Sequence, residues 1–187
     1  MWGFLKSYGL DAHFKVNIEP NHTTLAGHSY EHDLIMSSKF GYLGSIDANT
    51  GTENVGWDTD QFPMDVKKAM LVMQVIIEQG GIAPGGLNFD AKVRRESTDL
   101  EDYFIGHIGA MDTFARGLKA AAKLKGDGVY DKMLKARYAS YDEGFGKTIT
   151  NKTATFASCE EFIHKNGDAK LKSGKQEAFE VLYNDYV

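Results

Sequence analysis

The chain has 187 residues, 42% of them hydrophobic, which suits one compact domain or part of a larger one. Its 21 basic and 26 acidic residues give a net charge of −5, so it lacks the positive field expected of a nucleic-acid binder. Its one cysteine, Cys159, excludes an internal disulfide and a cysteine-based zinc site. We find no apolar run of about 18 residues and no signal-peptide pattern at the N-terminus, so we expect no membrane partner and a cytoplasmic location.

Short apolar runs alternate with helical patterns along the first two thirds of the chain. The expected elements, in chain order, are a strand at 14–18, a helix at 28–40, a strand at 43–46, a glycine-rich loop at 48–62, a helix at 64–79, a strand at 86–89 and a helix at 98–125. Gly41 and Gly80 are expected to end the first two helices. This threefold alternation predicts an α/β fold with parallel strands over residues 1–125.

The last expected helix of this part is long and amphipathic. Thr98 and Glu101 are spaced as a capping box at its start. Its predicted buried stripe consists of Leu100, Phe104, Ile108, Met111, Ala115 and Leu118. Residues 126–187 show no strand pattern, and we expect a helical extension with helices at about 130–140, 158–166 and 173–184.

Three acids directly follow the three expected strands. They are Glu19, Asp47 and Asp90. In a parallel barrel the C-terminal ends of the strands converge on one face, so these carboxylates are expected to meet. Carboxylates brought together without a partner repel and resist burial, which a divalent cation would resolve.

Two further patterns offer ligands to a cation. His22 lies three residues after Glu19, and oxygen plus imidazole ligands suit Mg²⁺, Mn²⁺ or Co²⁺. Asp58 and Asp60 in GWDTDQFP point the same way if that loop is extended. The alternative for each pattern is a solvated surface group.

The segment HSYEH at residues 28–32 also matches H-x-x-E-H, the inverted zinc-peptidase motif. On a helix, His28 and His32 would share a face and could hold Zn²⁺, with Glu31 as the base. The alternative is an exposed face of the helix that follows the first strand. A zinc peptidase is therefore kept as a marginal hypothesis.

Five separated motifs carry a resemblance to a known family. They are KVNIEPNHTTLAGHSYEHD, LGSIDANTG, GWDTDQFP, GGLNFDAKVRRESTDLEDYF and KARYASYDEGFGK. Together they resemble the C-terminal part of xylose isomerase of the longer class. The resemblance implies about the last three β/α units of a TIM-type (β/α) barrel over residues 1–125, and a helical, oligomer-forming arm over residues 126–187.

The resemblance also implies an activity and its ligands. The family converts an aldose to a ketose with two divalent metals, moving a hydride between C2 and C1 of the opened sugar, which implies xylose or glucose as substrate. Glu19 would bridge both metals. Asp47 and Asp90 would hold the structural metal, through which Glu19, Asp47 and Asp90 bind substrate. The second metal would be held by His22, Asp58 and Asp60, and Asp60 would help take a proton from metal-bound water.

The resemblance begins just before the sixth barrel strand, so several family features have no counterpart here. The ring-opening His–Asp pair and one ligand of the structural metal lie in the absent part. We expect a bare sheet edge and an uncovered apolar interior. The chain is expected to pair with a complementary N-terminal barrel chain or to form a homo-oligomer. The alternative is a non-enzymatic, metal-binding, self-associating partial barrel.

Overall fold

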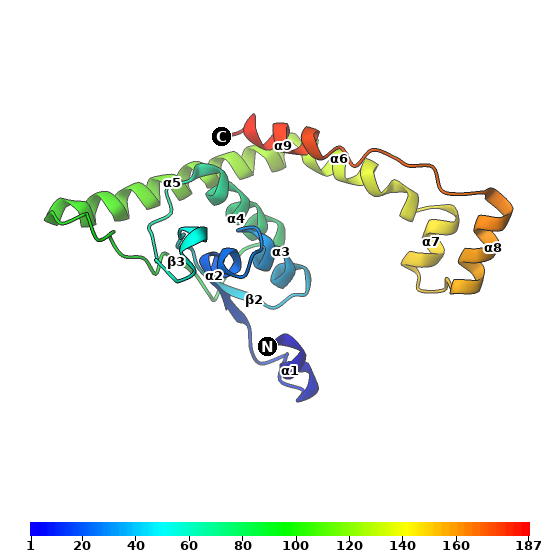
Figure 1. The fold of residues 1–187 in the computed structure, drawn as a ribbon, viewed down its shortest axis with the longest axis horizontal. Helices are drawn as coiled ribbons and strands as arrows, with labels where there is room; N and C mark the ends of the chain where they lie inside the picture. Colours follow the sequence, from blue (N-terminus) through cyan, green and yellow to red (C-terminus); the bar gives the residue numbers. More distant parts are fainter. The chain divides into compact units, whose positions relative to one another are not determined.

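The computed structural model describes all 187 residues and confirms the α/β class, with nine α-helices and one small parallel sheet (Figure 1). The chain divides into two compact units. The first comprises Met1–Lys123 with Tyr186–Val187, and the second comprises Leu124–Asp185. None of the helices is both long enough and apolar enough to cross a bilayer.

The sheet of the first unit contains three parallel strands in the order β1-β2-β3. They are β1 (Val16–Ile18), β2 (Leu43–Asp47) and β3 (Leu87–Asn88), each within about two residues of its expected place. The register pairs Ile18 with Ile46 and Asp47 with Asn88. Because the strands are parallel, their C-terminal ends lie side by side at the same end of the sheet.

Five α-helices begin in the first unit. They are α1 (Trp2–Ser7), α2 (Pro20–Leu25), α3 (His32–Lys39), α4 (Val66–Gln79) and α5 (Leu100–Asp127), and a 3₁₀ turn, η1, covers Glu53–Val55. The expected helix from residue 28 is wrong at its start. Pro20 begins a separate short helix, and Gly27 adopts φ +83°, a left-handed conformation that interrupts helical winding before His32. Gly80 ends α4 in the same conformation, as expected.

The two faces of the sheet differ in chemistry. The face toward the helices carries apolar side chains, and the hydrophobic core there includes Leu34 of α3, Ile46 of β2 and Val72 of α4. The opposite face carries Asn17, Ser45, Asp47 and Asn88. The expectation of an uncovered apolar interior is wrong at these strands, because the open face carries polar side chains. A register shift between Val16 and Asn17 lets both Leu43 and Ile46 of β2 face the core.

The predicted buried stripe of α5 is also wrong, because its members are exposed; Leu100 and Phe104, for example, are 77% and 63% exposed. We call Leu100, Phe104, Ile108, Met111, Ala115 and Leu118 the α5 stripe. The buried face of α5 instead carries mostly small side chains, as at Gly106, Ala110 and Gly117, together with Phe114, which joins the hydrophobic core. A Cβ on Gly117 would lie 2.7 Å from the carbonyl carbon of Ala69 in α4. Close approach of the two helices therefore selects small residues at the contact.

The start of α5 is stabilised one residue later than expected. The side chain of Asp102 accepts a hydrogen bond from the backbone N–H of Asp99 at 2.9 Å. A carboxylate in the first turn also interacts favourably with the helix dipole. Asp99 and Asp102 thus have the spacing that the sequence suggested for Thr98 and Glu101.

The second unit is helical. It contains α6 (Val129–Tyr138), α7 (Gly144–Thr150), α8 (Phe156–Asn166) and α9 (Gln176–Asn184), with a 3₁₀ turn, η2, at Ala139–Tyr141. Of these, α7 was not expected. The rings of Phe145 and Phe162 stack at 4.3 Å and join α7 to α8. Tyr130 packs edge-on against Phe179, with 5.9 Å between ring centroids, and so joins α6 to α9.

Candidate metal centre

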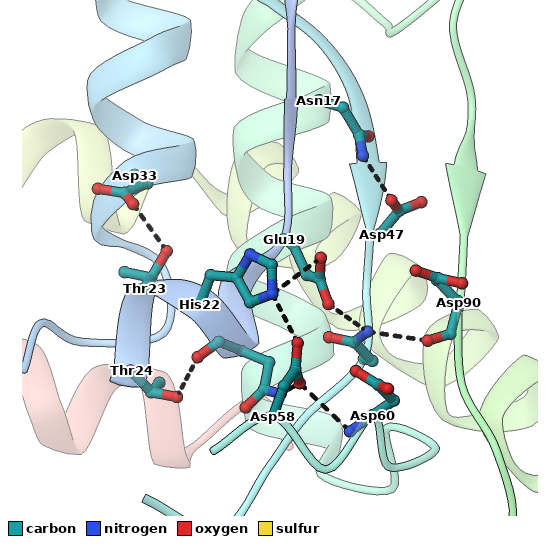
Figure 2. A network of polar contacts seen from close by, with 12 residues as sticks. Asn17, Glu19, His22, Thr23, Thr24, Asp33, Asp47, Asp58, Asp60 and Asp90 are labelled. Atoms are coloured by element: carbon teal, nitrogen blue, oxygen red, sulfur yellow. Dashed lines mark hydrogen bonds and ion pairs between the residues drawn. The ribbon is translucent and has the colours of Figure 1, made fainter. Parts of the chain in front are cut away.

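The three acids that follow the strands lie together in the structure (Figure 2). Glu19 comes directly after β1, Asp47 ends β2, and Asp90 lies two residues beyond β3. Each offers a carboxylate oxygen, and these oxygens lie within 4.8 Å of one another. The parallel strands bring these three side chains to the same end of the sheet. We call Glu19, Asp47 and Asp90 the strand-end cluster.

A second group shares one member with the first. His22 lies on α2 one turn after Glu19, and its Nε2 is 3.3 Å from Glu19 Oε2. The same nitrogen lies 2.6 Å from Oδ2 of Asp58, which comes from the loop after η1. We call Glu19, His22 and Asp58 the histidine cluster. Glu19 therefore belongs to both clusters.

Asp60 stands outside both clusters. Its Oδ2 forms an ion pair with Lys92 Nζ at 2.5 Å, and its backbone N–H donates to Asp58 Oδ1 at 3.4 Å. Asp60 and Asp90 have φ of 42° and 44°, the left-handed region that non-glycine residues seldom adopt. Such conformations gather at functional sites, where surrounding contacts hold them.

Burial, charge and hydrogen bonding together shift the pKa of each member of the histidine cluster. Partial burial, only partly offset by a hydrogen bond from Asn49, raises the pKa of Glu19. Burial acts to lower the pKa of His22, but its hydrogen bond to Asp58 and the charge of Glu19 outweigh burial and raise it. Burial acts to raise the pKa of Asp58, but hydrogen bonds involving Asp60 and His22 outweigh it and lower that pKa.

The residues of both clusters fit a hard divalent cation. Carboxylate oxygens with one imidazole nitrogen form a donor set that suits Mg²⁺, Mn²⁺ or Co²⁺. A cation that holds its ligands octahedrally at about 2.1 Å keeps neighbouring ligand atoms about 3.0 Å apart and opposite ones about 4.2 Å apart. Ligand atoms within 4.8 Å of one another need only small movements to reach that arrangement.

Four asparagines around the clusters were missed by the sequence reasoning. They are Asn17, Asn21, Asn49 and Asn88. The signal that could have found them is their spacing, because each lies two residues along the chain from a cluster acid. Asn17 and Asn88 lie on strands, where residues two apart point to the same face.

The HSYEH segment does not form the helix that a zinc peptidase motif needs. Residues 28–31 lie in a turn, and α3 begins only at His32. The rings of His28 and His32 stack on one another at 4.3 Å, and His32 Nδ1 lies 2.8 Å from Asp33 Oδ1. Neither histidine belongs to a group of possible metal ligands. The geometry gives the peptidase hypothesis no support.

A polar cleft of about 710 Å³ opens beside the histidine cluster. Asp58 and Lys92 line it together with the ring of Trp57 and the amide of Gln61. Polar groups next to an aromatic ring are the kind of lining that orients a small polar ligand. The cleft therefore gives solutes access to the Asp58 side of the cluster.

The amino-acid sequence of the chain is similar to those of known proteins. The XylA2 C-terminal domain family matches residues 134–187. A xylose isomerase of Thermotoga sp. (strain RQ2) is 53% identical over 186 residues, which cover all of this chain and 42% of that protein. Xylose isomerase 2 of Xanthomonas campestris pv. campestris (strain 8004) is 52% identical over 185 residues, which cover 99% of this chain and 42% of that protein. The chain thus spans less than half the length of these relatives.

Proposed function

Because the chain corresponds in sequence to the C-terminal part of xylose isomerases, we propose that it supplies the metal-ligand half of an aldose–ketose isomerase of that type. The observation that carries the proposal is the position of Glu19, whose carboxylate belongs to both ligand clusters. A bridging carboxylate between two sites is what a two-cation centre requires. The proposed substrate class is a small aldose such as xylose or glucose.

The proposed roles follow from the position of each side chain. Asp47 and Asp90, with Glu19, would hold one cation, and His22 and Asp58, with Glu19, would hold the other. Two bound cations would polarise the neighbouring oxygens of the opened sugar and keep its C1 and C2 in line. Asp60, next to Asp58, would accept a proton when its ion pair with Lys92 opens.

We also propose that the sheet is part of a TIM-type barrel completed by another chain. Both outer strands, β1 and β3, have an edge without a paired strand in this chain. The α5 stripe adds an exposed apolar helix face, and such faces mark interaction surfaces. Since the relatives are more than twice as long as this chain, their N-terminal part is the proposed occupant of these surfaces.

Two measurements on the purified chain test the proposal. Calorimetric titration with Mn²⁺ or Co²⁺ is expected to show binding that Asp58→Asn or His22→Gln abolishes at the histidine cluster. Asp33→Asn is the matched control, because Asp33 also pairs with a histidine, His32, but lies outside the clusters. Ketose formation from xylose is then followed with the chain alone and with the separately produced N-terminal part of the Thermotoga sp. (strain RQ2) xylose isomerase.

The expected result is ketose formation in the mixture that is lost with Asp58→Asn and kept with Asp33→Asn. A mixed complex that binds cation but makes no ketose would refute the isomerase proposal. The exposed α5 stripe favours one second candidate, a non-enzymatic, cation-binding partial barrel that self-associates. That candidate predicts a homo-oligomer by light scattering and no ketose with either preparation.

A further inference from the structure

Asparagine side chains contact the acids of both clusters. Asp58 accepts a hydrogen bond from Asn21, and Glu19 Oε1 accepts one from Asn49 at 2.7 Å. The two oxygens of Asp47 are held separately. Asp47 Oδ2 accepts from Asn17 at 2.5 Å (Figure 2), and Asp47 Oδ1 accepts from Asn88 at 3.2 Å.

This arrangement follows from the spacing along the chain. Asn17 and Asn21 flank Glu19 at two residues on either side, and Asn49 follows Asp47 at the same distance. Asn17 of β1 and Asn88 of β3 reach across the sheet to Asp47 at the end of β2, and Asn49, two residues beyond β2, reaches Glu19. Asn21 lies on α2 and reaches Asp58 in the loop after η1. Each amide thus contacts an acid distant in sequence rather than the acid nearest to it.

Asn49 is the most constrained of the four. It is fully buried, and its amide nitrogen donates both to Glu19 Oε1 and to the main-chain oxygen of Asp90, at 2.7 and 2.9 Å. Its own main-chain oxygen accepts from the buried hydroxyl of Tyr30 at 3.2 Å. Its amide oxygen is buried without a hydrogen-bond partner. A buried polar atom without a partner costs free energy, and the hydrogen bonds of the amide nitrogen act against that cost.

Building on the cation binding proposed above, we propose that these four asparagines are positioning residues that orient the ligand carboxylates for two cations. Asn49 holds Oε1 of Glu19 by a hydrogen bond, while Oε2 of Glu19 lies 3.3 Å from Nε2 of His22. Occupying one lone pair of a carboxylate oxygen leaves the other for a cation and blocks rotation of the group. Hydrogen bonds of this kind to metal ligands commonly change metal affinity about 10–100-fold.

The proposal makes a different prediction for three of these asparagines. Asn49→Leu, which keeps the size but removes the amide, is expected to lower Mn²⁺ affinity at both sites by about 10–100-fold. Asn21→Leu is expected to weaken only the site that Asp58→Asn removes. Asn88→Leu is expected to weaken only the site that Asp47→Asn removes.

Gln74→Leu is the matched control for Asn49→Leu. Gln74 is a mostly buried amide that donates to the carboxylate of Glu78 at 2.9 Å, and Glu78 belongs to neither cluster. The control loses the same kind of hydrogen bond, so it is expected to lower stability but to leave Mn²⁺ affinity unchanged. The measurements are calorimetric titration of the full chain with Mn²⁺, the absorption spectrum of bound Co²⁺, and thermal unfolding of each variant.

The Co²⁺ spectrum reports ligand geometry, which a merely structural role would not change. A folded Asn49→Leu chain with parental Mn²⁺ affinity and parental Co²⁺ spectrum overturns the inference and leaves the proposed function standing. If the parent chain binds no Mn²⁺, both fail. If Asn49→Leu does not fold, Asn49→Ser replaces it, because a hydroxyl keeps a donor in a smaller volume. A smaller loss of affinity with an altered Co²⁺ spectrum is then expected, and unchanged values overturn the inference.

Discussion

Gly51 lies where a single added methyl group would disturb the histidine cluster without touching a ligand. A Cβ at this position would come 2.0 Å from Oδ1 and 2.8 Å from Cγ of Asn21. Asn21 is only 1% exposed, so its side chain has no solvent to move into, and its amide donates to Asp58. Gly51→Ala must therefore either compress the packing around Asn21 or break its hydrogen bond to Asp58.

Each of these two outcomes has a known cost. Overpacking a well-filled interior costs about 1–3 kcal/mol, and leaving a buried hydrogen-bonding group without its partner costs about 1–3 kcal/mol. Since breaking the hydrogen bond relieves the compression, the two costs are alternatives and do not add. We expect Gly51→Ala to lower the free energy of unfolding by about 1–3 kcal/mol, which shifts the urea midpoint by on the order of 1 M.

The assay is urea unfolding followed by circular dichroism, together with Mn²⁺ titration. Gly86→Ala is the control, because a Cβ there meets nothing within 4 Å, and it is expected to change stability by less than about 0.5 kcal/mol. Gly51→Ala is also expected to weaken Mn²⁺ binding at the histidine cluster, since Asn21 can no longer hold Asp58. Equal stability and equal Mn²⁺ affinity in the two variants would refute this view of the packing around Asn21.

Two further predictions concern the glycines of α5 and the carboxylate of Asp33. Gly117→Ala is expected to destabilise the chain by about 1–2 kcal/mol, because the added Cβ would meet the backbone of α4 and overpacking outweighs the gain in helix propensity. Gly126→Ala, which has open space around its Cβ, is the control and is expected to stabilise the chain by about 0.5–1 kcal/mol. Equal urea midpoints for the two variants would contradict this view of the α4–α5 contact. Burial acts to raise the pKa of Asp33, but hydrogen bonds from His32 and Thr23 outweigh it and lower that pKa. Ionised Asp33 therefore stabilises the fold above about pH 4, and this contribution is lost as the pH falls through the lowered pKa. Asp33→Asn is expected to lower the melting temperature at pH 7 and to change it little near pH 3. A melting-temperature difference between variant and parent that does not depend on pH would contradict the stabilising role of ionised Asp33.

The sequence alone was sufficient for features that depend on local pattern. Apolar runs followed by Glu19, Asp47 and Asp90 were enough to expect parallel strands with acids at their ends, because strand alternation and βα connectivity are short-range properties. Gly80 was enough to end α4, because few other residues adopt its left-handed conformation readily. The family resemblance rested on motifs of the same local kind.

Tertiary packing decided what periodicity could not. The apolar pattern of α5 showed an amphipathic helix but not which side meets α4, and the close approach at Gly117 turned the small residues inward and left the α5 stripe exposed. Likewise, the spacing of the asparagines is present in the sequence, but only the pairing of β1, β2 and β3 showed that Asn49 contacts Glu19. A contact between residues 30 positions apart depends on strand pairing, which the order of residues along the chain does not contain.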